Sequence, residues 1–111
     1  MNKKELIERL LALPKDIEAA EKQVLDMSRT VDEARDQVAD IEKNAILNGG
    51  ITGKNETERK AQMAALTAEA REAVTDAETW LNVSRVGYNK LMNEFRALQA
   101  VAGLLRKEGS V

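Results

Sequence analysis

Three aspartates have a spacing that could support metal binding. Asp32, Asp36 and Asp40 lie four residues apart, so on a helix they share one face, and clustered carboxylates are ligands for Mg²⁺ or Mn²⁺. A metal site in a helical bundle takes inward-facing carboxylates from several helices, typically together with histidine. The chain has no histidine, and these aspartates lie outside the apolar positions described below. We therefore interpret them as a solvated face and expect no bound metal.

The glycine-rich segment 48–54 invites comparison with phosphate-binding loops. A P-loop has four residues between its glycines, followed by Lys and then Ser or Thr. Here three residues separate Gly49 from Gly53, and Asn55 follows Lys54. The segment therefore predicts a turn between two helices, with glycines for tight backbone geometry and a side-chain cap on the second helix. The predicted turn and capping residues are Gly49, Gly50, Gly53, Asn55 and Glu58.

Groups that could serve in catalysis are scarce. The 111 residues contain no cysteine and no histidine, which excludes thiolate nucleophiles, histidine general bases and Cys or His zinc sites. Glu5, Glu8, Glu94 and Tyr88 could do acid–base chemistry if they were buried together, but nothing in their spacing requires it. We expect no enzyme activity, no cofactor and no small-molecule substrate.

Two apolar seams dominate the rest of the sequence. In each, the residues alternate in steps of four and three, which places them on one side of a helix. The first seam has no polar member, and the second is interrupted only by Ser84. A step of four from Ala70 to Val74, where three is due, indicates a phase shift upstream of the second seam. The seams are Leu6, Leu10, Leu13, Ile17, Ala20, Val24, Met27, Val31, Ala34, Val38, Ile41 and Ala45, and Val74, Ala77, Leu81, Ser84, Tyr88, Leu91, Phe95, Leu98, Ala102 and Leu105.

These seams predict an all-α protein, a long antiparallel helical hairpin that forms one domain over residues 1–111. Two helices joined by a short loop run antiparallel. We expect a helix over about 3–47, a loop over 48–55 and a helix over about 56–107. Pro14 lacks a backbone N–H, so the first helix either kinks there or breaks and leaves residues 2–12 as a separate helix. The heptad phase continues through Pro14, which favours the kinked helix.

The chain has more apolar residues than two seams require, which indicates self-association. If Ala45 lies opposite residues near 57, the surplus gathers at the open end of the hairpin, with all three aromatics in 80–95. An apolar surface of this kind marks an interface, so we expect a homodimer in which two hairpins form a four-helix bundle. The alternative is a three-helix monomer whose N-terminal segment folds back. The predicted self-association residues are Leu6, Ile7, Leu10, Leu11, Trp80, Tyr88, Leu91, Met92, Phe95, Leu98, Val101 and Leu105.

The distribution of charge supports a second hypothesis for the open end of the predicted hairpin. The whole chain, with 17 basic and 19 acidic residues, gives no reason to expect nucleic-acid binding. Residues 1–15 and 85–107, however, have nine basic residues against three acidic ones. Binding to nucleic acid through this basic end is therefore the alternative function. Its predicted contact residues are Arg85, Lys90, Arg96, Arg106 and Lys107.

The sequence also bears on where the protein acts. The N-terminal segment begins with lysines, but Glu5, Glu8 and Arg9 interrupt the apolar core that a signal peptide needs. No stretch approaches the roughly 20 apolar residues of a membrane span. The absence of cysteine fits a reducing compartment. We expect a cytoplasmic protein with no membrane contact.

One segment carries a family resemblance. Residues 53–62, Gly-Lys-Asn-Glu-Thr-Glu-Arg-Lys-Ala-Gln, join a seam helix to an Ala- and Glu-rich helix that ends in the Leu-rich segment 98–105. This order resembles small coiled-coil proteins encoded in bacteriophage and prophage genomes, which carry a Gly-Lys-Asn-x-x-x-Arg turn between two helices. The resemblance implies a phage or prophage accessory protein from the DNA replication and recombination region. The excess apolar surface favours a non-enzymatic role through contacts with an unidentified protein partner, and the alternative is a nucleic-acid-binding accessory of replication or recombination. The resemblance supplies no catalytic residues. In physical terms, Arg59 is expected to pair with Asp40 or Glu42.

Overall fold

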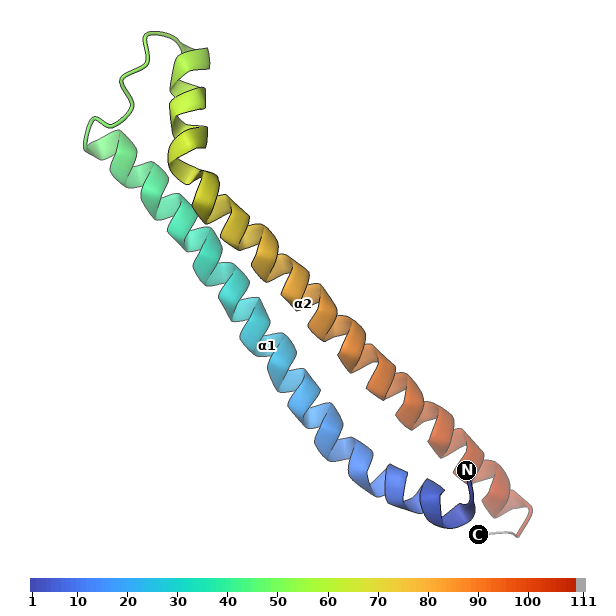
Figure 1. Ribbon diagram of the computed structural model, residues 1–111. Coiled ribbons are helices and arrows are strands. Elements are labelled where there is room, and N and C mark those ends of the chain that lie inside the picture. Colours follow the sequence, from blue (N-terminus) through green and yellow to red (C-terminus); the bar gives the residue numbers. More distant parts are fainter. Residues whose placement is uncertain (110–111) are drawn as a thin grey trace. The chain divides into compact units, whose positions relative to one another are not determined.

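The computed structural model describes residues 1–109 and contains two helices in this range, α1 over Lys3–Leu47 and α2 over Glu56–Lys107 (Figure 1). They pack antiparallel as an all-α helical hairpin, which confirms the predicted fold class at this level. The chain divides into two compact units. Unit 1 combines Met1–Leu25 with the chain from Asn82 onward, and unit 2 is Asp26–Leu81. Both units are therefore antiparallel pairs of helical segments, and unit 2 contains the connecting loop.

The N-terminus of α1 has a side-chain cap that the sequence analysis missed. The backbone N–H of Glu5 donates to Asn2 Oδ1 at 2.8 Å, and Asn2 Nδ2 donates to Glu5 Oε1 at 3.2 Å. An asparagine cap with a glutamate three residues later is a form of the capping box. Because the pair directly precedes the first seam residue, the spacing was a signal that could have identified this helix start.

Helix α1 runs without interruption through Pro14. Residues 2–12 therefore do not form a separate helix. A proline inside a helix removes one backbone hydrogen bond and usually bends the helix. Figure 1 shows α1 curving in its blue N-terminal part, which contains this proline.

The C-terminus of α1 ends in a Schellman motif. Gly49 has a φ of 68°, in the left-handed region that glycine adopts without strain. The Gly50 N–H donates to the Ala45 carbonyl at 2.8 Å, and the Gly49 N–H donates to the Ile46 carbonyl at 3.4 Å. These two bonds satisfy carbonyls at the end of the helix that would otherwise lack a partner.

The loop then folds back onto the first turns of α2. Gln62 Oε1 accepts from the Thr52 N–H at 2.9 Å and from the Gly53 N–H at 2.7 Å. Its Nε2 donates to Thr52 Oγ1 at 3.0 Å. A Cβ atom on Gly53 would lie 2.7 Å from the Arg59 backbone nitrogen and 2.8 Å from Glu58 Cβ. Only glycine fits at this position without a shift of the backbone.

Asn55 caps α2, because its Oδ1 accepts from the Glu58 N–H at 2.9 Å. Glu58 Oε2 in turn accepts from the Lys54 N–H at 2.7 Å, one residue before the cap. The Asn55 side chain thus satisfies a backbone donor in the first turn of α2, and the Glu58 side chain satisfies the backbone donor just before the cap. Glu56 and Glu58 also place negative charge in the first turn of α2, where the helix dipole is positive.

Every residue of the two predicted seams is buried or half-buried. The predicted phase shift upstream of the second seam is wrong. Thr67 is fully buried, whereas Leu66 beside it is 50% exposed. The alternation of four and three therefore continues without a break through Met63, Thr67, Ala70 and Val74, with a threonine at a seam position.

Thr67 is tolerated in the core because its hydroxyl is satisfied. Thr67 Oγ1 donates to the Met63 carbonyl at 2.8 Å and accepts from Arg71 Nε at 3.0 Å. Arg71 also donates from a terminal nitrogen to Glu42 Oε1 on α1 at 2.7 Å. The buried hydroxyl, the arginine and the carboxylate form one chain of hydrogen bonds that joins the two helices.

The partner expected for Arg59 is wrong. Its guanidinium donates to the Gly53 carbonyl at 3.4 Å within the loop, and the cation that binds Glu42 is Arg71. The expected register at the loop end is wrong for the same reason. Since Glu42 pairs with Arg71 and the helices run antiparallel, Ala45 lies opposite residues near 68 rather than near 57. The first turns of α2 and the loop consequently extend past the end of α1 (Figure 1).

Candidate self-association interface

The ion pairs between the helices define two sides of the hairpin. We use the letters a to g for heptad positions, with the seam residues at a and d. In unit 2, Arg35 pairs with Glu78 at 3.6 Å and Arg71 with Glu42 at 2.7 Å, and all four residues are at e positions. In unit 1, the cross-helix pair involves g positions instead. We call the side formed by e and b positions the e flank, and the side formed by g and c positions the g flank.

The g flank of unit 1 is closed by a two-bond ion pair. Arg9 Nε donates to Glu94 Oε2 at 2.7 Å, and a terminal nitrogen donates to Glu94 Oε1 at 2.8 Å. The remaining terminal nitrogen donates to Asp16 Oδ2 at 3.2 Å. The hydrogen bond from Arg9 lowers the pKa of Glu94, partial burial opposes this effect, and the arginine charge adds to it. The same pairing raises the pKa of Arg9.

This pair makes the stability of the hairpin depend on pH. Because the folded-state pKa of Glu94 lies below its unfolded value, its contribution is complete at neutral pH. It is lost as the pH falls through the lowered pKa. We therefore expect Glu94→Gln to lower the thermal unfolding temperature at pH 7, and the difference from wild type to vanish near pH 2. A scan from pH 7 to 2 measures this. Glu72→Gln, at an exposed position, is the matched control, and a pH-independent effect of Glu94→Gln would contradict the assignment.

The e flank of unit 1 has no cross-helix ion pair within the described residues, and it contains a groove of about 430 Å³. The groove lies between Leu10 of α1 and the a, b and e positions of α2. Its polar rim comes from a glutamine and an arginine, and its floor is apolar. The lining residues are Leu10, Phe95, Gln99, Ala102, Gly103 and Arg106.

Apolar side chains flank this groove. Ile7 and Leu11 of α1 are 46% and 76% exposed, and they occupy e and b positions. Leu25, at a b position further along α1, is 60% exposed. A leucine that is three-quarters exposed gains little from the hairpin itself. The e flank of unit 1 thus presents apolar surface that the monomer leaves in water.

The residues predicted for self-association occupy three different environments. Leu6 is buried within the hairpin, so it cannot contact a second molecule directly. Trp80 belongs to unit 2, whereas the other eleven belong to unit 1. The half-buried members are Leu10, Tyr88, Leu91, Met92, Phe95, Leu98 and Leu105, and the exposed ones are Ile7, Leu11, Trp80 and Val101.

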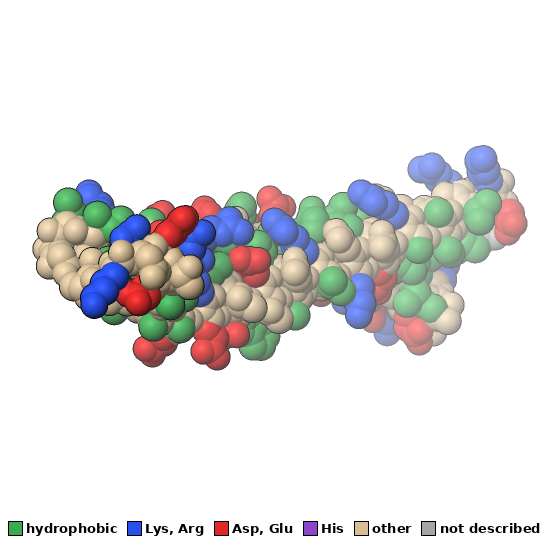
Figure 2. Space-filling model, turned by 90° about the horizontal axis from the view of Figure 1, so that it is seen from above, with side chains coloured by type: hydrophobic (Ala, Val, Ile, Leu, Met, Phe, Trp, Pro, Cys, Tyr) green, Lys and Arg blue, Asp and Glu red, His purple; other side chains and the backbone are tan. Residues whose placement is uncertain are grey.

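Exposed apolar residues also occur where the sequence analysis did not expect them. Ile46, Leu47 and Leu66 in unit 2 are 66%, 70% and 50% exposed, respectively. All three lie beside the seams rather than in them, since Ile46 and Leu47 follow the seam residue Ala45 and Leu66 precedes the buried Thr67. Figure 2 shows hydrophobic side chains, in green, scattered among charged ones along the visible face. The excess apolar surface is therefore not confined to the open end.

The five cations predicted to contact nucleic acid are all exposed. None of them takes part in an ion pair within residues 1–109. Unit 1 has ten basic and seven acidic residues, and unit 2 has seven basic and twelve acidic ones. Unit 1 is therefore more basic than unit 2. Its excess of three basic residues is smaller than the excess of six in residues 1–15 and 85–107. The cations are Arg85, Lys90, Arg96, Arg106 and Lys107.

Asp32, Asp36 and Asp40 are exposed, and the described residues contain no group of three or more Asp, Glu, His or Cys side chains placed to hold a metal ion. Glu5 and Glu8 are exposed as well. Neither α1 nor α2 includes a segment apolar enough to cross a membrane. Comparison of the chain with protein-family models, with curated proteins and with solved structures found no match.

Proposed function

We propose that this protein is a non-enzymatic interaction module that self-associates through the e flank of unit 1. The observation that supports the proposal is the exposed apolar surface of this flank, where Ile7 is 46% and Leu11 is 76% exposed beside the groove. Contiguous apolar side chains that a monomer leaves in water mark an interface.

This surface suits a homodimer. A stable protein interface removes about 800 Å² from each partner. The e flank of unit 1 offers an apolar groove and exposed leucine and isoleucine side chains for that purpose. The g flank is less suitable, because a partner there would have to cover the charged groups of Arg9, Asp16 and Glu94. Two hairpins joined at their e flanks would form a four-helix bundle.

A role as a phage or prophage accessory protein, which the resemblance implies, stays a prediction. Self-association is compatible with that role, since a dimeric hairpin presents every other exposed surface twice to a partner. The cytoplasmic location expected from the sequence is likewise a prediction. Contact with nucleic acid is a competing use of this flank, because three of the five predicted contact residues, Arg85, Arg96 and Arg106, lie on it.

Substitution at Leu11 tests the proposal. Because this side chain is 76% exposed, Leu11→Glu should leave the hairpin folded but place a charge in the interface. Burial of a leucine contributes about 1.5–3 kcal/mol, so we expect at least a roughly tenfold weaker dimer by sedimentation velocity. Leu104→Glu is the matched control, since Leu104 is 61% exposed on the g flank and should leave the dimer intact. A dimer unaffected by Leu11→Glu would contradict the proposal.

A further inference from the structure

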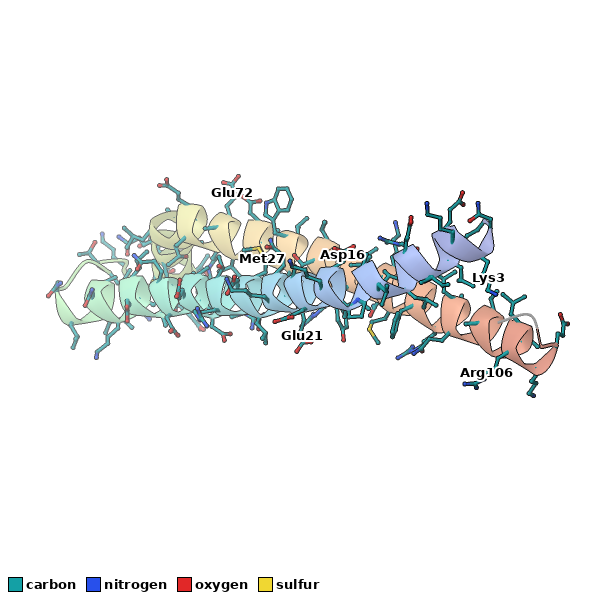
Figure 3. All side chains as sticks on the ribbon, turned by 90° about the horizontal axis from the view of Figure 1, so that it is seen from below. Lys3, Asp16, Glu21, Met27, Glu72 and Arg106 are labelled. Atoms are coloured by element: carbon teal, nitrogen blue, oxygen red, sulfur yellow. The ribbon has the colours of Figure 1, made fainter. Side chains whose placement is uncertain are left out.

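The e flank of unit 1 has charges of opposite sign on its two helices. On α1, Glu18 and Glu21 occupy b and e positions, and on α2 the cations of this flank are arginines. None of these side chains takes part in an ion pair in the part of the chain that the structure describes. Figure 3 shows Glu21 and Arg106 on the same side of the helix pair, and Asp16 of the g flank on the other side.

The α2 strip of this flank has no acidic residue. From Arg85 to Arg106 its members alternate in steps of four and three, like a seam, and three of the seven are arginines. Three of its members, Gln99, Gly103 and Arg106, line the groove, so the strip runs along the groove described above. The strip consists of Arg85, Asn89, Met92, Arg96, Gln99, Gly103 and Arg106.

The α1 strip of the same flank has two carboxylates between apolar residues, and it consists of Ile7, Leu11, Pro14, Glu18, Glu21 and Leu25. Its exposed apolar members, Ile7, Leu11 and Leu25, lie on both sides of Glu18 and Glu21 in sequence. A partner surface that covers the α2 strip would need carboxylates to pair with its arginines and apolar groups to fill the groove. The α1 strip of a second copy of this chain has both.

We propose that the e flank of unit 1 binds the same flank of a second copy, with the α1 strip of each copy seated on the α2 strip of the other. This inference rests on the proposed self-association and names its orientation. In such an isologous dimer, every contact occurs twice. Because Arg9 pairs with Glu94, Glu18 and Glu21 lie at the level of Arg85, and in this dimer they meet Arg85 of the other copy. Ile7 and Leu11 enter the groove, which lies toward Arg106. The charges determine which helix faces which, and the apolar area supplies most of the affinity.

The observations favour a second copy over nucleic acid as the occupant of this flank. Glu18 and Glu21 lie beside the arginines on the same flank and would repel phosphates. Exposed apolar side chains such as Leu11 gain nothing from a phosphate backbone. Because the two flanks of a dimer are identical, opposite charges on the two helices complement each other without any further partner.

Charge reversal on each strip tests this orientation. One variant has Arg85→Glu, Arg96→Glu and Arg106→Glu, and the other has Glu18→Arg and Glu21→Arg. Either variant alone places like charges opposite each other in its own dimer, so we expect at least a tenfold weaker homodimer. An equimolar mixture restores opposite charges at both copies of the contact. We expect the mixture to form heterodimers with near wild-type affinity, measured by sedimentation velocity with one variant fluorescently labelled.

A matched control reverses charges away from the flank. Lys15→Glu with Lys107→Glu changes two exposed f positions and should leave the dimer unchanged. Far-ultraviolet circular dichroism verifies that each variant remains helical. If the wild type dimerises and both charge-reversed variants dimerise equally tightly, the proposed orientation alone is wrong. The same holds if the equimolar mixture fails to associate. A wild type that is monomeric would overturn the proposed function itself, and reversal that abolishes binding to a DNA oligonucleotide but leaves the dimer unchanged would assign the arginines to nucleic acid.

Discussion

Leu13→Ala is expected to destabilise the hairpin by about 3 kcal/mol, the largest effect of any conservative core substitution in unit 1. Leu13 is the one apolar side chain among the described residues that is completely inaccessible to solvent. Removal of three carbon atoms loses their transfer free energy and leaves a cavity between two helices. With only two helices in contact, the chain has few other buried groups to compensate. Urea unfolding at a fixed protein concentration measures the change.

The control for Leu13 is the same substitution at an exposed position. Leu104 is 61% exposed on the g flank, so Leu104→Ala should change the free energy of unfolding by less than about 0.5 kcal/mol. If the two variants were equally stable, the seam would not be the core of the folded protein. Since self-association also adds to stability, both variants must be compared at the same concentration.

Gly53→Ala is expected to destabilise the hairpin by about 2 kcal/mol through the loop. The new Cβ would lie 2.7 Å from the Arg59 backbone nitrogen, and backbone atoms cannot move as a flexible side chain can. A shift of the loop would weaken the hydrogen bonds that Gln62 makes with Thr52 and with residue 53. Thermal unfolding followed by circular dichroism measures the loss.

Gly87→Ala is the matched control for Gly53, because a Cβ at Gly87 would meet no atom within 4 Å. This glycine lies inside α2, where alanine is the better helix former by about 0.5–1 kcal/mol. The two glycine-to-alanine substitutions should therefore have effects of opposite sign. A stabilising effect at Gly53 would show that the loop is not packed against α2 in solution.

The two helices follow from the sequence because their determinants are local. Steps of four and three between apolar residues fix the buried side of each helix, and the glycines and Asn55 are located where the helices end. Thr67 was missed because its core position depends on Arg71 and Glu42, which supply a hydrogen-bonding chain that no seam pattern shows. Gln62 was missed for a similar reason, since its role depends on how the loop folds back.

The register and the interface depend on contacts between distant residues, which the sequence pattern specifies less well. A heptad seam pairs equally well with another seam after a shift of seven residues. The choice among such registers is made by pairs such as Arg71 with Glu42 and Arg9 with Glu94. The surplus of apolar residues was visible in the sequence, but its division between two flanks and two units required the paired helices.

The mass of the wild-type protein in solution tests the central claim most directly. Sedimentation equilibrium over about 1 to 100 µM covers the affinities expected of an interface of this size. We predict a mass that rises with concentration to twice the chain mass of 12.3 kDa, and that falls back when Leu11 is replaced by Glu. A constant mass of 12.3 kDa over the whole range would contradict the claim that this hairpin is completed by a second copy of itself.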